Sequence, residues 1–233
     1  MRRAAIAGLL WLCAAASGAA QTPAPSAAAA DRPGPWVIDI RGTTVSLPND
    51  AAFFPDVPAS TAVPSRGYGL DAGAHIYLLQ IGPARVGVGG VLLRARGTAS
   101  PGSSGDDEQR SSGGLKTTPD VAALLTIAGP QVSMNFGSRG GWSYLSVGAG
   151  LAKISTRTSS FADENDEDDV RAGQLIDHGT RSTINFGGGA RWFAKPRLAF
   201  SFDLRFHIIG AGGDDRPTPR TTVVAASAGI SLR

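Results

Sequence analysis

Apolar and polar residues alternate one by one between Arg197 and Gly210, over the stretch RLAFSFDLRFHIIG. The two faces that this alternation separates are Leu198, Phe200, Phe202, Leu204, Phe206 and Ile208 on one side and Arg197, Ala199, Ser201, Asp203, Arg205 and His207 on the other. A period of two residues indicates a β-strand. A face of three phenylalanines and three aliphatic side chains, backed by a charged face, either packs on a protein core or meets lipid.

Seven further segments alternate in the same way, and clusters of Gly, Pro, Ser and Asp separate them. We therefore expect eight strands, over residues 37–47, 68–81, 84–97, 118–136, 142–158, 179–193, 197–209 and 220–233. The apolar positions change phase at Gly89-Gly90 and again at Gly129-Pro130. A β-bulge at each place would restore a single apolar face. A turn at Gly129-Pro130 is the alternative, but it gives an odd number of strands, whereas single-chain bacterial barrels have even numbers.

The expected connections alternate strictly between long and short. The long polar ones cover residues 48–66, 98–116, 159–178 and 210–219, and the tight turns lie at 82–83, 138–141 and 194–196. With the amino terminus in the periplasm, every long connection emerges on the outer side of the membrane. This layout is typical of an outer-membrane barrel, which has short periplasmic turns and long outer loops.

A soluble barrel of the lipocalin type would also alternate, with its apolar face turned inward. Two features favour lipid instead. The lysines and glutamates lie almost wholly in connections, whereas strands that face water would carry many more of them: Lys116, Lys153, Lys195, Glu108, Glu164 and Glu167. Aromatic residues gather at the strand ends nearest the short turns, where we predict an aromatic girdle at the membrane interface, formed by Trp36, Phe136, Trp142 and Trp192.

The amino-terminal end is predicted to direct export. Arg2 and Arg3 precede an apolar run that is too short to span a bilayer, and small residues follow up to Ala20. We interpret residues 1–20 as a signal peptide, residues 21–35 as an Ala/Pro-rich periplasmic linker, and residues 36–233 as the barrel. The bulky Leu12 before Cys13, the one cysteine, argues against a lipid-attachment site, and no disulfide is expected.

Composition narrows the classes of function. Without Arg2 and Arg3 the chain has 20 Lys and Arg against 19 Asp and Glu, which leaves a net charge of +1. No basic stripe accompanies the high pI, so we expect no nucleic-acid partner. No run of about 18 apolar residues follows the signal, so no transmembrane helix is expected.

The chain resembles the small eight-stranded outer-membrane proteins, among them the OmpA transmembrane domain, OmpX and OmpW. The resemblance covers residues 36–233 and rests on this layout, on NFGSRGGWSYLSVGAG at 135–150 and on ARWFAKPRLAFSFDLRF at 190–206. It implies an all-β, eight-stranded antiparallel up-and-down transmembrane β-barrel in the cell outer membrane. Outer-membrane lipid, lipopolysaccharide and the barrel assembly machinery are the partners that it implies. The ending Leu232-Arg233 departs from the family's aromatic terminal residue, which bears on assembly and not on the fold.

The inward face of the barrel is the candidate site. An eight-stranded barrel is just wide enough for side chains to fill, and buried charges must pair, so we predict a salt-bridged plug. Its expected members are Asp39, Arg41, Asp71, His75, Asn135, Asn185, Arg191, Asp203, Arg205 and His207. A three-residue turn at 194–196 would place Asn185 opposite Arg205 and Asp203 opposite Gly187. A permeation or ligand-binding role for these residues is the alternative.

Neither catalysis nor metal binding is predicted. Lipid A deacylases carry a histidine followed two positions later by serine, and His75, His178 and His207 all lack that serine. The acidic run at 163–169 lacks the spaced ligands and central glycine of a calcium loop, so we interpret it as a solvated loop tip without metal or cofactor. We expect a monomeric, non-enzymatic protein that serves envelope structure or surface interaction through four long extracellular loops. OmpW-like passage or binding of a small apolar molecule is the alternative, and lipid A modification is the third possibility.

Overall fold

The computed structural model describes residues 35–100, 120–138, 140–158, 175–212 and 217–233. Contacts divide the chain into residues 1–31 and 32–233, and the description below concerns the second unit. The predicted signal peptide, residues 21–34 of the predicted linker and the acidic run at 163–169 lie outside the described residues. In the described part, no helix is long and apolar enough to cross a membrane.

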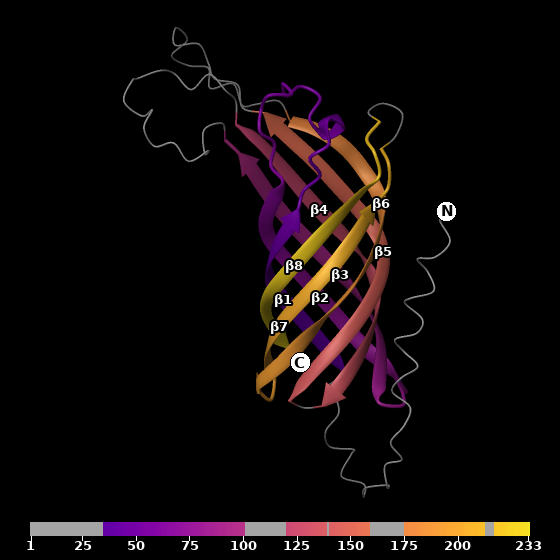
Figure 1. Cartoon of the computed structure of the whole chain (residues 1–233). Coiled ribbons are helices and arrows are strands. Elements are labelled where there is room, and N and C mark those ends of the chain that lie inside the picture. The colour runs from indigo at the N-terminus through magenta and orange to yellow at the C-terminus, as the bar shows by residue number, and fades with distance from the viewer. Residues whose placement is uncertain (1–34, 101–119, 139, 159–174, 213–216) are drawn as a thin grey trace, which may run out of the picture. The chain divides into compact units, whose positions relative to one another are not determined.

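Eight strands form one closed antiparallel barrel, in which each strand pairs with its neighbours in sequence and the last closes on the first (Figure 1). The predicted fold class is confirmed. The strands are β1 (Trp36–Ser46), β2 (Arg66–Ile81), β3 (Ala84–Ala99), β4 (Val121–Ser138), β5 (Gly141–Thr158), β6 (Leu175–Lys195), β7 (Leu198–Ile209) and β8 (Thr221–Leu232). β6 begins before the predicted Gly179, because Leu175 still pairs with Arg157 of β5.

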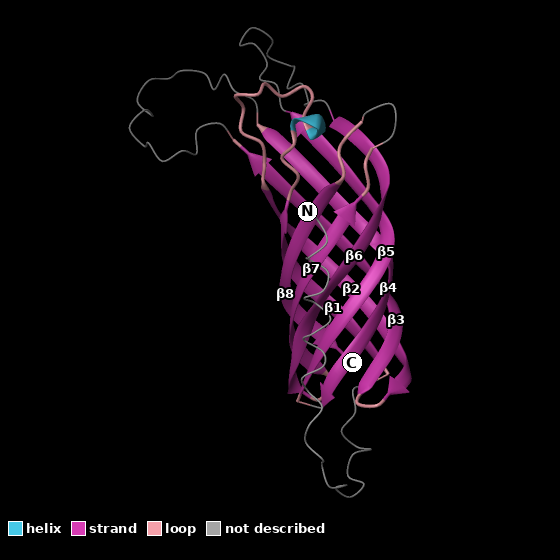
Figure 2. Cartoon of the chain, turned by 45° about the vertical axis from the view of Figure 1, so that its right-hand side comes forward, coloured by secondary structure: helices cyan, strands magenta, loops and turns pink. Residues whose placement is uncertain are grey.

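The connections define two rims of the barrel. We call the end with the short β2–β3, β4–β5 and β6–β7 turns the turn rim, and the opposite end the loop rim (Figures 1 and 2). The β1–β2 connection lies at the loop rim and contains the 3-10 helix η2 (Ala51–Phe53). Asp50 caps this helix, because its side chain accepts a hydrogen bond from the Ala52 amide at 2.9 Å.

Neither of the two predicted bulges is present. β3 and β4 pair in one continuous register past Gly90↔Pro130, and β4 keeps the same register with β5 on both sides of Gly129-Pro130. The phase of the apolar residues changes for a different reason. On β4 the inward side chains are polar near the turn rim, as at Gln131, and apolar near the loop rim, as at Ile127. The change of phase therefore reflects a change in the side chains that line the lumen, while the strand itself remains regular.

The predicted register between β6 and β7 is also wrong. Asn185 lies opposite His207, and Arg205 lies opposite Gly187. β6 continues to Lys195 and pairs there with Leu198, so the turn is shorter than the three residues assumed, and an irregularity between Phe193 and Lys195 adjusts the pairing beyond it.

Candidate functional site

The interior of the barrel holds all ten of the residues predicted to point inward. Each of them is at most 5% exposed. Seven of them belong to one ion-pair and hydrogen-bond network in the middle of the lumen: Asp39, Arg41, Asp71, Asn185, Arg191, Asp203 and Arg205. We call these seven residues the ionic layer. They come from β1, β2, β6 and β7, so the layer joins strands on different sides of the barrel.

Asp39 is the centre of one half of the ionic layer. Arg191 donates to both of its carboxylate oxygens, from Nε at 2.9 Å and from Nη2 at 2.7 Å. Arg41 lies 2.8 Å from Oδ2 of the same carboxylate, and the Ser231 hydroxyl donates to Oδ1. Bidentate contacts of this kind are among the strongest between a guanidinium and a carboxylate. The Arg191 guanidinium also lies over the Tyr144 ring, 4.0 Å from its centre.

Asp203 is the centre of the other half. Arg205 donates to both of its oxygens, at 3.2 and 2.9 Å, and the Tyr144 hydroxyl donates to Oδ2 at 2.6 Å. Arg205 also donates to Asn185 Oδ1 at 3.1 Å, which gives the contact predicted between these two side chains although they are not opposite each other. Gly189 lies opposite Asp203, and a side chain there would meet both the β7 backbone and the Tyr144 hydroxyl.

Arg41 connects the two halves. Its Nη1 donates to Asp71 at 2.9 Å and lies 3.8 Å from Asp203. The ionic layer therefore contains three carboxylates and three guanidinium groups, so its formal charge is zero. Buried charges are tolerated when they are paired in this way. The layer provides no excess charge that would attract an ion of either sign.

The other three predicted interior residues lie outside this network. His75, Asn135 and His207 are buried on the inward face but form none of the hydrogen bonds described for the ionic layer. The His75 ring instead stacks on Tyr77, with the ring centres 6.3 Å apart. Gly89 on β3 makes room for it, because a side chain there would meet the imidazole.

The floor of the lumen, at the turn rim, is apolar and aromatic. Val37, Tyr77 and Trp142 are buried there, and the half-buried Phe193 packs against them. Trp142 was predicted to face the membrane interface, and this is wrong: it is 1% exposed and points into the lumen. Alternation places it on the same inward face of β5 as Tyr144. Its position at the turn-rim end is as predicted, but its face is not.

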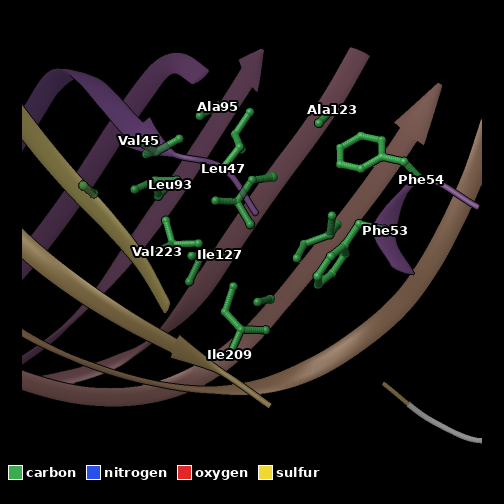
Figure 3. Packing of buried hydrophobic residues seen from close by; sticks show 14 of the residues in the cluster. Val45, Leu47, Phe53, Phe54, Leu93, Ala95, Ala123, Ile127, Ile209 and Val223 are labelled. Atoms are coloured by element: carbon green, nitrogen blue, oxygen red, sulfur yellow. The ribbon is translucent and has the colours of Figure 1, made fainter. Parts of the chain in front are cut away.

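The lumen near the loop rim is filled by a second apolar cluster, which we call the apolar cap. Side chains from β1, β3, β4, β5, β7 and β8 point toward one another there, and Phe53 and Phe54 of the β1–β2 connection reach in to join them (Figure 3). The apolar cap consists of Val45, Leu47, Phe53, Phe54, Leu93, Ala95, Val121, Ala123, Leu125, Ile127, Ala152, Ile154, Ile209, Val223 and Ala225.

Phe53 is fixed in the apolar cap by polar neighbours as well as by packing. The Thr156 hydroxyl donates to its backbone carbonyl at 3.1 Å, and the same hydroxyl lies 3.1 Å from His178 Nε2. The His178 ring meets the Phe53 ring edge-on, and the Arg181 guanidinium lies 5.3 Å from the centre of the Phe53 ring. The sequence interpretation missed this cap, because it assumed a polar lumen throughout.

The outward face is exposed and apolar on all eight strands. We call this surface the apolar belt, and its large members are Ile38, Ile40, Leu70, Ile76, Leu78, Val88, Leu92, Val132, Met134, Leu145, Val147, Leu151, Ile184, Phe186, Phe200, Phe202, Leu204 and Ile230. A continuous band of this size is a lipid-facing surface rather than a water-facing one. Trp36 and Trp192 are exposed on the outward face at the turn rim, as predicted for the interface, and Phe136 is half-buried there. The structure is therefore that of a transmembrane barrel.

Within the described ranges, no group of three or more His, Cys, Asp or Glu side chains is placed to hold a metal ion. No family model matches the sequence, and no curated protein matches it either.

Several solved structures of small outer-membrane proteins are similar to this chain. Neisserial surface protein A is 13% identical, with a TM-score of 0.45 and coverage of 85% of this chain and 97% of that one. Ail, the attachment invasion locus protein of Yersinia pestis, is 14% identical at a TM-score of 0.40, covering 84% and 95%. OprG from Pseudomonas aeruginosa is 11% identical at 0.41, covering 84% and 94%. At these scores the assignment of the fold rests on the strand pairing described above.

Proposed function

We propose that this chain is a non-enzymatic outer-membrane protein that acts through its outer surface and its long connections, in envelope structure or surface interaction, and not through its lumen. The side chains that fill the lumen are the observation that supports this proposal. An aromatic floor, a charge-balanced ionic layer and the apolar cap occupy it in succession from the turn rim to the loop rim. A solute that moved along the barrel axis would therefore have to pass these three layers in turn.

Opening such a path would be costly in two ways. A polar solute would have to separate the paired charges at Asp39 and Asp203, and unpairing a buried charge costs several kcal/mol. It would also have to displace Phe53, which is fully buried and hydrogen-bonded through its carbonyl. Side chains that fill an eight-stranded barrel in this way make it a packed core and not a pore.

Reconstituted protein is therefore expected to leave planar bilayers without conductance steps and vesicles without swelling in a small sugar. Because the ionic layer closes the lumen independently of the apolar cap, the double variant Phe53→Ala, Phe54→Ala should also conduct nothing. Resolved conductance steps in the unaltered protein would contradict a closed lumen. Conductance steps in the double variant alone would show that the apolar cap, and not the ionic layer, keeps the lumen of the unaltered protein from conducting.

Binding or passage of a small apolar molecule is the second candidate, and the apolar cap is the observation that favours it. Such a molecule would take the place of Phe53 and Phe54, which enter from the β1–β2 connection and not from a strand. Uptake of a fluorescent apolar probe separates the two candidates. Vesicles with the protein should take up the probe no faster than protein-free vesicles if the lumen is closed, and faster if the cap admits apolar molecules.

The arrangement of the described histidines also supports a non-enzymatic role. His178 is the one that contacts a hydroxyl, that of Thr156, as a histidine base would contact its nucleophile. The Thr156 hydroxyl, however, donates to the Phe53 carbonyl at 3.1 Å, so its single proton is directed at that carbonyl and not at His178. His75 and His207 lie within the filled lumen.

Outer-membrane lipid with its lipopolysaccharide and the barrel assembly machinery are the partners of the proposed role, and the chain is proposed to work as a monomer. The closed sheet supports a monomer, because β1 pairs with β8 and the described strands leave no edge to pair with a second chain.

A further inference from the structure

Three arginines gather on the outer surface of the barrel just above the apolar belt. Arg94 and Arg96 project from β3, and Arg157 projects from β5. Together with Ala122, Leu124, Ser155 and Leu175, among others, they line one surface groove of about 180 Å³. The pairing with β4 explains why they line one groove: Arg96 is opposite Leu124, and Arg157 is opposite Ala122, the outward residue before Leu124 in β4. We call this surface the arginine groove.

The depth of the arginine groove follows from its neighbours along the same strands. Leu92, 53% exposed, is the outward residue before Arg94, and Leu151, 58% exposed, is the outward residue before Lys153. On both strands, the outward side chain changes from apolar to cationic between one outward position and the next. We infer from this change that the groove lies where the hydrocarbon of the bilayer ends and the lipid headgroups begin.

The three arginines carry charge that the described chain leaves unbalanced. Lys153, the nearby cation of β5, is paired with Asp177 at 2.6 Å. Among the residues that the structure describes, no carboxylate forms an ion pair with Arg94, Arg96 or Arg157. Three exposed guanidinium groups around one groove repel one another, and an anion between them would remove that repulsion.

Guanidinium groups are well suited to a phosphate, because their planar donors can contact two of its oxygens at once. The floor of the groove adds the apolar side chains of Ala122 and Leu124 and one buried hydroxyl, that of Ser155. A cationic edge above an apolar floor at headgroup depth matches a phosphorylated lipid, whose chains lie toward the belt.

We propose that Arg94, Arg96 and Arg157 bind the phosphate groups of the glycolipid of the outer leaflet, lipid A, with its acyl chains lying toward Leu92. The inference rests on the proposed location and orientation, which place the loop rim in the outer leaflet. It names one lipid contact of the outer surface, and it does not depend on whether the lumen conducts.

The test titrates the folded full chain with diphosphorylated lipid A and counts bound lipids by native mass spectrometry. The triple variant Arg94→Gln, Arg96→Gln, Arg157→Gln is expected to bind at least about tenfold more weakly, since each lost charge-assisted contact weakens binding severalfold. The matched control Arg66→Gln, Arg197→Gln, Arg220→Gln also removes three exposed arginines and should remain within about twofold of the unaltered chain. Faster migration of unboiled protein on a gel verifies that each variant is folded.

Three results would overturn the proposal: equal binding by the triple variant and the unaltered chain, equal binding of lipid A without phosphates, or binding of phosphatidylglycerol as tight as that of lipid A. If the triple variant does not fold, the single change Arg96→Gln is titrated instead, with a loss of about threefold expected and no loss contradicting the proposal. A conducting lumen would overturn the proposed function while leaving this titration unaffected, so the two failures are distinguishable.

Discussion

Replacing Arg191 with methionine is expected to lower the free energy of unfolding by about 3–5 kcal/mol, because removal of one partner leaves a buried charge without its counter-charge. Arg191 is fully buried and donates both hydrogen bonds of the bidentate contact with Asp39. Arg41 and Ser231 would still contact Asp39, but Arg41 also donates a hydrogen bond to Asp71. Urea unfolding of protein folded into vesicles, followed by tryptophan fluorescence, measures the loss.

The matched control removes both charges at once. In the double variant Asp39→Asn, Arg191→Met the layer keeps two carboxylates and two guanidinium groups, so its formal charge is again zero. Its loss should be smaller than the sum of the losses in Asp39→Asn and Arg191→Met alone. A loss below about 1 kcal/mol in Arg191→Met would show that the ionic layer does not hold the barrel together.

Phe202→Arg is expected to cost about 2–4 kcal/mol, the cost of a cation on the lipid face near the middle of a bilayer. Phe202 is 47% exposed on β7, between the belt residues Phe200 and Leu204. The comparison is Thr222→Arg, also outward but at the loop rim, where the cost falls to about 0–1 kcal/mol. Ser201→Arg tests the inward face of β7, because the new charge would lie in the lumen opposite Arg191.

Urea unfolding in vesicles again gives the free energies. Equal losses for Phe202→Arg and Thr222→Arg would mean that depth along the barrel has no effect, which would contradict the assignment of the apolar belt to lipid. The loss in Ser201→Arg has a different cause, the repulsion between its buried charge and that of Arg191, so it should fall when Arg191 is also changed to methionine, whereas the loss in Phe202→Arg should not.

The strands could be predicted from the sequence because alternation is a local property. On β7 every second residue from Leu198 to Ile208 faces outward, as the pattern indicates. The same rule predicts that Asp39, Arg191 and Asp203 point inward, whatever strands they pair with, and all three are buried there. Which charges meet could not be predicted, because that depends on the register: a shorter β6–β7 turn moves Arg205 from Asn185 to Gly187.

The apolar cap could not be predicted from alternation alone, although the sequence contains its signal. On β4 the positions of Leu125 and Ile127 are in phase with those of Gln131 and Ser133, so one inward face changes from apolar to polar. A bulge and a change of lining give the same sequence pattern, and only the pairing with β3 and β5 separates them. Trp142 was misplaced for a related reason, because an indole at a strand end suits either an interface or an apolar floor.

The barrel is closed and turns its apolar belt toward lipid. The most direct test is to fractionate cells that make the protein and to compare boiled with unboiled samples of each fraction on a detergent gel. We predict that the protein is in the membrane fraction and that the unboiled band migrates faster, because a closed barrel stays folded in detergent. Protein in the soluble periplasmic fraction, with no difference between the two samples, would contradict the claim.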